Sequence, residues 1–416
     1  MLKNKLSIAN LLIIVVMLFI SATANGKESV VGMSQKVYKV LNQAQILYEQ
    51  GDGVSALAQL SKARSDYNKR LSDYENAHIL NMMAAIQQDR GNTEIALSLF
   101  EEAVSYPKLP ATQKSRFYKN IAQLSIMTEH YDKALDYIRK AIDSSLNPDA
   151  GIYVLAAQAL YYLERFDDAR KDIDHAINLD RKMTNKKGSL IERPPRESWL
   201  QLANAIYYSQ KDYQAMLEVH HQLLLFYPSD QYLLNLAVIY GELEQSEKQL
   251  ALMESVFEGG YIDDGNKIMN LANLFLIHEI PYKAAVLIEA AIDEEKIEKN
   301  VSSLDRLGQA WLMAGEYEKA IVYLSQVAIR ANDGEAYVRL ANVYMALSHW
   351  SDAAAALNKA IEKGQLKDAG SVYLIHGMTL FRLKEFNAAR QSFEMAKKFS
   401  SSKKLAAKWQ QYMDNE

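Results

Sequence analysis

Seven side-chain amides recur along the chain in a pattern that favours binding over catalysis. Each follows a small residue of a repeated helix, and the seven are Gln45, Gln123, Gln158, Asn204, Asn273, Gln309 and Asn342. An amide side chain carries both a hydrogen-bond donor and an acceptor, so a row of them can pair with the backbone of an extended peptide of any sequence. Three residues further along, Tyr161, Tyr207 and Phe381 are expected to add apolar pockets. The alternative is that the amides only keep an exposed groove soluble while the tyrosines pack between helices.

Catalytic or metal-binding motifs are missing from the sequence. The eight histidines are scattered and form no HExxH motif. The one adjacent pair, His220 and His221, would point about 100° apart on a helix, which is poor geometry for holding one metal ion. The chain has no cysteine, no phosphate-binding glycine loop and no GxSxG motif. We therefore expect a protein that is not an enzyme and that uses no cofactor and no metal.

The elements that must position the amides are set by an internal repeat. A small residue, here called the crossing residue, recurs mostly every 33 to 40 residues, at Ala44, Ala84, Ala122, Ala157, Ala203, Ala237, Ala272, Gly308, Ala341 and Gly377. Twelve residues later stands a second alanine, except at Gln249, and sixteen residues later a large apolar residue. Such a period predicts antiparallel helix pairs that approach closely at the small residues and stack on one another.

This spacing resembles the tetratricopeptide repeat. The best match is LGQAWLMAGEYEKA at 307–320, where Leu307, Gly308, Trp311 and Ala320 fall on signature positions. The resemblance covers about 33–396 and implies an all-α fold. It implies a right-handed superhelical solenoid of about ten helix-turn-helix repeats, with the first helices lining a concave groove. In this family, asparagine directly after the crossing residue often holds the backbone of a ligand.

The N-terminal segment has the pattern of a secretory signal peptide. Lys3 and Lys5 precede the apolar run LLIIVVMLFI, and Ala22 to Ala24 form a small-residue site after which we expect cleavage. The run is shorter than the roughly 20 residues of a spanning helix. An uncleaved anchor is the alternative. We therefore expect export, with localisation in the periplasm.

The rest of the chain divides at changes in this pattern. We expect a signal peptide at 1–24, a short polar tail at 25–32, about four N-terminal repeats at 33–180, a basic proline-containing insertion at 181–197, about six C-terminal repeats at 198–400, and a capping helix and tail at 401–416. The insertion reads either as a docking loop for an acidic partner or anionic lipid, or as a solvated connector. In the capping helix, Leu405, Trp409 and Tyr412 share one face, which is expected to cover the last repeat.

Charge and composition narrow the choice of partner. The formal net charge is −4, and loss of Lys3 and Lys5 with the signal peptide makes it −6. Nucleic acid is a poor partner for such a chain, because its binding depends on many Lys and Arg side chains. Since no other stretch reaches membrane-spanning length, membrane association is expected only through partners. The isolated protein is expected to be a monomer.

A more specific resemblance concerns the C-terminal half. The stretches WLQLANAIYY at 199, IPYKAAVLIEAAIDEEKIEKN at 280 and LFRLKEFNAARQSF at 380 are similar to exported tetratricopeptide proteins associated with Ton energy-transduction systems of Gram-negative bacteria. The resemblance implies a periplasmic, non-enzymatic adaptor in TonB-dependent outer-membrane uptake. Its partner would be a TonB-type transducer or the inner-membrane motor proteins. Two alternatives are a scaffold for an envelope export, secretin or outer-membrane machine, and an accessory subunit of a periplasmic enzyme.

Overall fold

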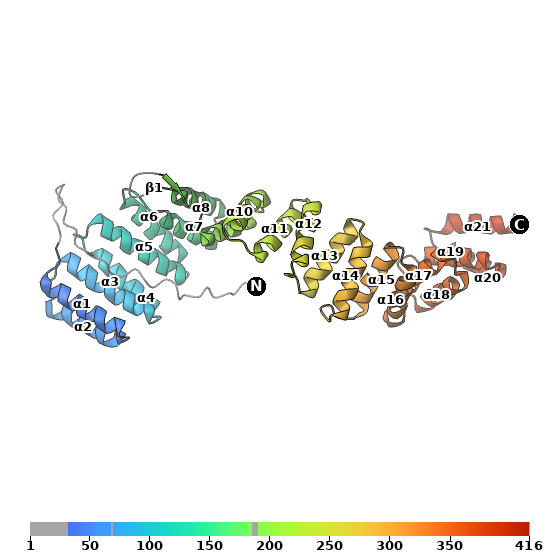
Figure 1. The fold of residues 1–416 in the computed structure, drawn as a ribbon, viewed down its shortest axis with the longest axis horizontal. Helices are drawn as coiled ribbons and strands as arrows, with labels where there is room; N and C mark the ends of the chain where they lie inside the picture. Colours follow the sequence, from blue (N-terminus) through green and yellow to red (C-terminus); the bar gives the residue numbers. More distant parts are fainter. Residues whose placement is uncertain (1–31, 68–69, 185–189, 416) are drawn as a thin grey trace. The chain divides into compact units, whose positions relative to one another are not determined.

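The fold is a series of paired helices, seen in a computed structural model that describes residues 32–67, 70–184 and 190–415 (Figure 1). The predicted signal peptide at 1–24 lies outside the described residues. The chain forms two compact units, one ending at Leu163 and one beginning at Glu164. The division of the repeats at 181–197 stays a prediction. No helix in the described ranges is both long enough and apolar enough to cross a membrane.

The first unit contains seven helices within its described residues (Figure 1). They are α1 Gln35–Glu49, α2 Gly53–Tyr67, α3 Asp73–Asp89, α4 Thr93–Ser105, α5 Ala111–Met127, α6 Tyr131–Asp143 and α7 Ala150–Tyr162. Buried side chains such as Leu80, Phe100 and Phe117 join α3, α4 and α5 into one apolar core.

The second unit continues the pattern and adds one short ribbon (Figure 1). Its elements are α8 Phe166–Arg181, β1 Lys182–Thr184, β2 Leu190–Glu192, α9 Glu197–Ser209, α10 Tyr213–Phe226, α11 Asp230–Glu242, α12 Ser246–Glu258, α13 Gly265–Ile277, α14 Pro281–Asp293, α15 Val301–Met313, α16 Tyr317–Arg330, α17 Glu335–Ala346, α18 Trp350–Lys363, α19 Ala369–Arg382, α20 Phe386–Ala396 and α21 Lys403–Asn415. Strands β1 and β2 pair antiparallel inside the predicted insertion, where we expected no strand. The all-α repeat fold with a C-terminal capping helix is confirmed.

Within each unit, the helices of a pair are joined by the same tight turn. After α15, the backbone N–H of Gly315 donates to the Leu312 carbonyl at 3.1 Å and that of Glu316 donates to the Trp311 carbonyl at 3.0 Å. This is a Schellman cap, in which the first residue beyond the helix cap adopts the left-handed conformation. Gly315 has a φ of +75°, which costs glycine nothing. The turn reverses the chain in four residues and forces the two helices together.

The crossing residues are small because the second helix leaves no space there. A Cβ atom on Gly308 would lie 2.7 Å from Leu324 Cδ2 and 3.3 Å from the Leu324 backbone nitrogen. Ala320 and Leu324 are fully buried against it. The predicted close approach at the small residues, with a large apolar side chain sixteen residues later, is therefore how this pair packs.

The fifth repeat has a register that the sequence analysis placed one residue too early. Elsewhere the left-handed turn residue lies seven positions after the crossing residue, as Gly315 does after Gly308. In the fifth repeat it is Lys211, with a φ of +56°, so the crossing residue is Asn204 and not Ala203. The misreading arose because an alanine precedes the asparagine and looks like the expected small residue. His220 then occupies the large apolar position and is 1% exposed.

The capping helix packs through a face that only partly matches the predicted one. Buried Ala406 and Met413 of α21 face the last repeat, and the Trp409 ring stacks on Phe393 with centroids 5.9 Å apart. Of the other two residues expected to cover that repeat, Tyr412 is 49% exposed but meets the Phe381 ring of α19 edge-on, with centroids 5.9 Å apart, whereas Leu405 remains 48% exposed. The packed face is centred on Ala406, because a small residue there lets α21 lie close to the helices beneath it.

The packing at Gly308 generates a stability prediction. Replacing Leu324 by alanine removes a fully buried side chain and leaves a cavity, so the unfolding free energy of the second unit should fall by about 2 to 5 kcal/mol. Val322→Ala on the same helix is the control, because Val322 is 54% exposed and its loss should cost under about 0.5 kcal/mol. Urea unfolding followed by circular dichroism measures both. Equal effects of the two substitutions would contradict this packing.

Candidate binding surface on the first helices

Six of the seven predicted amides lie directly after a crossing residue, at what we call the +1 position. In the first unit these are Gln45, Gln123 and Gln158 on α1, α5 and α7, and in the second unit Asn273, Gln309 and Asn342 on α13, α15 and α17. Asn342 is exposed and the other five are partly exposed. Three successive first helices of the second unit therefore each present one amide.

With the corrected register, Asn204 is not at a +1 position and does not belong to this row. It is itself the crossing residue of α9, and its carbonyl oxygen Oδ1 is buried with no hydrogen-bond partner in the described part of the chain. The +1 position of this repeat is Ala205, which has no side-chain hydrogen-bonding group. The amide row of the second unit thus begins at α13.

The amide on α15 belongs to a small polar network. Gln309 Nε2 donates to Asp305 Oδ2 at 2.8 Å on the same helix. Asp305 Oδ1 in turn pairs with Arg339 Nη2 of α17 at 2.7 Å. The carboxylate charge is therefore matched by a guanidinium, while the carbonyl oxygen of Gln309 remains available as an acceptor. The network holds Gln309 in place and leaves this part of the surface close to neutral.

Hydrogen bonds and ion pairs join several of the first helices of successive pairs within each unit. In the second unit, the Tyr232 hydroxyl on α11 donates to Glu197 Oε1 on α9 at 2.6 Å. Arg339 and Asp305 join α17 to α15. In the first unit, Lys119 Nζ on α5 lies 2.8 Å from Asp149 Oδ1 at the start of α7. Of the helices that carry +1 amides, α15 is thus joined to α17, and α5 is joined to α7.

A row of exposed apolar side chains beside the amides was missed by the sequence analysis. These residues stand five after the crossing residue, at the +5 position, and are Met127, Tyr162, Ile277 and Met313, with exposures of 48%, 51%, 69% and 56%. Positions +1 and +5 are one helical turn apart and share a face. The available signal was a large apolar residue as the last residue of the first helix, where a solvated end would be polar.

The three predicted aromatic pocket residues have different surroundings. Tyr207 is 6% exposed, its hydroxyl donates to Asp174, and burial together with that bond raises its pKa. It belongs to the helix packing, and the exposed aromatic of α9 is Tyr208 at 65%. Tyr161 is partly exposed and meets the Tyr162 ring edge-on, with centroids 5.7 Å apart. Phe381 lies 5.6 Å from the Trp409 ring of the capping helix, which covers part of it.

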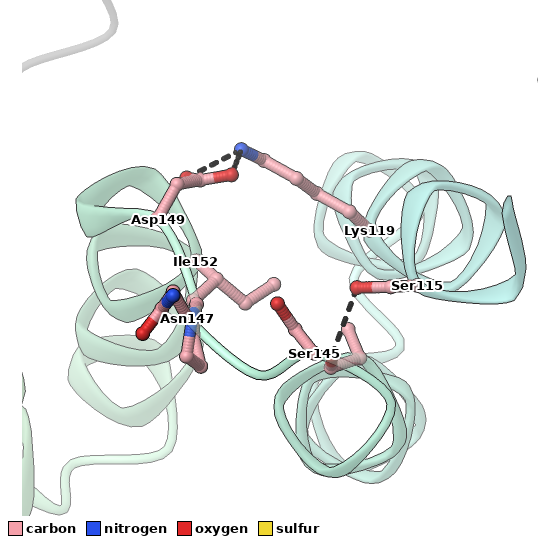
Figure 2. Close-up of a pocket in the computed structure, with 8 residues that line it drawn as sticks. Ser115, Lys119, Ser145, Asn147, Asp149 and Ile152 are labelled. Carbon is pink, nitrogen blue, oxygen red and sulfur yellow. Dashed lines mark hydrogen bonds and ion pairs between the residues drawn. The ribbon is translucent and has the colours of Figure 1, made fainter. Parts of the chain in front are cut away.

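A small polar cavity in the first unit does not add a catalytic site (Figure 2). It encloses about 90 Å³ and is lined by Ser115, Lys119, Ser145, Asn147 and Asp149, among others. Lys119 bridges to Asp149, and the Ser115 hydroxyl donates to the Ala141 carbonyl at 2.8 Å. The serine thus donates to a backbone carbonyl, and no general base contacts it among the residues described. The arrangement ties α5 and α6 to the start of α7.

The adjacent histidines do not act together. His220 is buried, and its Nδ1 lies 3.0 Å from the Met216 carbonyl, to which it donates. His221 is exposed. No cluster of three or more potential metal ligands occurs among the residues that the structure describes. Burial lowers the pKa of His220, and it does the same to His376, whose Nδ1 lies 3.1 Å from the Ser392 hydroxyl. Both imidazoles are therefore neutral parts of the core.

Two segments of the chain match family models. Residues 150–183 match one tetratricopeptide-repeat model and residues 312–371 match another. The chain therefore contains tetratricopeptide repeats, as the sequence analysis predicted. Neither match is to a catalytic family. No curated protein sequence matches the chain.

Solved structures of tetratricopeptide proteins are similar to parts of the chain. One from Parabacteroides merdae has 17% identity and a TM-score of 0.41, covering 67% of this chain and 99% of its own. YrrB, described as having an unusual peptide-binding site, has 16% identity and a TM-score of 0.37, with coverages of 48% and 91%. The TPR2AB domain of yeast Sti1 in complex with pHSP90 has 15% identity and a TM-score of 0.35, with coverages of 66% and 98%.

The buried histidines generate a prediction about pH. An unfolded histidine has a pKa of about 6.5, and burial lowers this value for His220 and His376 in the fold. The folded state thus binds fewer protons, so stability should be full above about pH 6.5 and fall as the pH drops through that value. A double variant, His220→Asn with His376→Asn, keeps a hydrogen-bonding group near each Nδ1 position without titrating.

Urea unfolding between pH 7.5 and 5 measures this effect. The double variant should lose less unfolding free energy over that range than the native chain. His130→Asn is the matched control, because His130 is exposed and is not among the groups that lower the pKa of His220 or His376. An identical loss in the double variant would show that other groups carry the acid sensitivity.

Proposed function

We propose that the chain is a non-enzymatic adaptor whose first-helix surface binds an extended segment of a partner protein. The observation that carries this proposal is the alignment of Asn273, Gln309 and Asn342 on successive first helices, with Ile277 and Met313 one turn away. A row of amides beside a row of apolar side chains matches the alternation of backbone and side-chain groups along an extended chain.

The chemistry of the row defines the segment that fits it. The amides supply donors and acceptors to the backbone, which gives affinity without dependence on sequence. Exposed Ile277 and Met313 offer apolar contacts, and a methionine adapts to differently shaped side chains. The Asp305 charge is already paired with Arg339. We therefore infer that a segment with uncharged, apolar side chains binds here in preference to a charged one.

We further propose that this adaptor works in the periplasm beside a TonB-type transducer or its inner-membrane motor proteins. Two features of the sequence support the proposal. These are the signal-peptide pattern at 1–24 and the similarity of the C-terminal half to exported tetratricopeptide proteins of Ton systems. Iron-complex uptake across the outer membrane is the process that this similarity favours.

Site-specific photo-crosslinking tests which surface binds and to what. The protein used is residues 25–416 with a benzophenone side chain at position 277, on the first helix α13. It should capture a partner from whole cell envelopes. The matched control is position 329 on the second helix α16, because Ile329 is 73% exposed and Ile277 is 69% exposed. Recovery of a TonB-like transducer or motor protein at 277 alone is expected. Export, cell-wall or hydrolase proteins at 277 would instead favour one of the alternative adaptor roles, and equal capture at both positions would contradict the surface.

Removing the amides tests the row itself. The triple variant Asn273→Ala, Gln309→Ala and Asn342→Ala should weaken binding of the captured partner at least about tenfold, because several backbone hydrogen bonds of roughly 0.5 to 1.5 kcal/mol each are lost. Helix content should stay unchanged. A control triple variant carries alanine at three exposed second-helix amides, Gln214, Asn358 and Gln391. Isothermal titration calorimetry compares the two, and equal affinities would remove the amide row from the binding site.

A further inference from the structure

The exposed side of the capping helix forms an apolar recess that the rest of the fold leaves uncovered. Leu405, Lys408, Trp409 and Tyr412 of α21 surround an open hollow of about 250 Å³. They are spaced at helical positions that share one face. Leu405 and Tyr412 are about half exposed, whereas Ala406 and Met413 on the neighbouring face are packed onto the last repeat. Trp409 and Tyr412 also contact Phe393 and Phe381 of the last repeat, so the recess borders the cap, while Leu405 and Lys408 form its exposed side.

This recess lies in a strongly basic segment of an acidic chain. Residues 397–413 contain five lysines and no Asp or Glu, while the whole chain has a formal net charge of −4. Exposed Lys398, Lys403, Lys404 and Lys408 have no ion-pair partner among the described residues. The lysines and the recess together are called the C-terminal patch.

The carboxylates at the edge of the patch are already neutralised. Glu394 accepts hydrogen bonds from Lys397 at 3.1 Å and from Gln410 at 2.8 Å, which lower its pKa. Asp414 pairs with Arg390. Among the described residues, no ion pair therefore balances the positive charge of the exposed lysines. An anionic group placed there gains attraction that no internal pair competes with.

We propose that the C-terminal patch docks a protein segment that carries one large apolar side chain flanked by carboxylates. The apolar side chain enters the recess between Leu405 and Tyr412, where aromatic walls exclude water as in the centre of a protein interface. The flanking carboxylates lie against Lys404 and Lys408 at the rim. The site is independent of the amide row and would let the adaptor hold a second partner.

The geometry favours a protein segment over a lipid surface. A membrane-bound helix buries a whole apolar face about 5 to 10 Å into the headgroup region. In α21 the face that contains Ala406 and Met413 is already packed onto the last repeat. What remains exposed is a recess bordered by Leu405 and Tyr412, which suits a single inserted side chain. Charge complementarity then specifies an acidic segment around that side chain.

Fluorescence anisotropy with a defined probe tests this docking site. The probe is a fluorescein-labelled peptide with one phenylalanine between two runs of glutamate, added to residues 25–416. We expect saturable binding that weakens at least about tenfold in Lys404→Glu with Lys408→Glu, because attraction becomes repulsion. Leu405→Gln should also weaken it, without a change in charge. The control Lys267→Glu with Lys299→Glu makes the same charge change at exposed lysines elsewhere and should bind as the native chain does.

Several results would overturn the proposal. A peptide with serine in place of phenylalanine that binds equally well would show attraction to charge alone. The native chain failing to bind the probe would exclude the acidic segment. Binding to anionic phospholipid vesicles without binding to the probe would make a membrane surface the occupant. If the chain dimerises and Leu405→Gln abolishes the dimer, the occupant of the patch is a second copy of the chain. The amide-row variant should bind the probe unchanged, which separates this site from the proposed function.

Discussion

The close approach of two helices at a small residue is the constraint on which the rest of the structure depends. A Schellman turn returns the chain within four residues, so the second helix must pass directly beside the end of the first. Only Gly or Ala normally fits at that point, as the contact between Gly308 and Leu324 shows. Because each pair buries just one side of each helix, the next pair must stack on it. Repetition of this one close contact between paired helices therefore builds the fold.

That constraint also decides which side chains are free to bind. The crossing residue and its large apolar partner face each other inside the pair, so positions one and five residues later on the first helix point away from it. These positions carry the amides and the exposed apolar residues, including Asn273 and Ile277. Binding residues can therefore vary without disturbing the packing.

The two candidate surfaces differ in the chemistry that they recognise. On α15 and α17 the charge of Asp305 is matched by Arg339, which suits an uncharged segment. On α21, Lys403, Lys404 and Lys408 have no ion-pair partner in the described part of the chain and lie beside an apolar recess, which suits an acidic segment. An adaptor with two such surfaces can hold two partners of different chemistry at once, because neither surface competes for the other's ligand.

Much of the fold could be predicted from the sequence because its period follows from local contacts. Small residues recur where helices cross and turn residues recur where they end, so the helix pairs, the capping helix and six of the seven amide positions emerge from spacing alone. The alanine before Asn204 shifted the predicted register of the fifth repeat by one residue, because size alone does not distinguish two neighbouring positions on a helix.

Only the tertiary structure decided how side chains of similar type divide between packing and surface. Tyr207 is buried between helices and its hydroxyl donates to Asp174, while neighbouring Tyr208 is exposed. On α21, both Leu405 and Met413 are apolar, yet only Met413 is buried. The sequence by itself determined that helices pair and where they cross. Which face each helix buries depended on the neighbouring helix, whose surface shape no local pattern records.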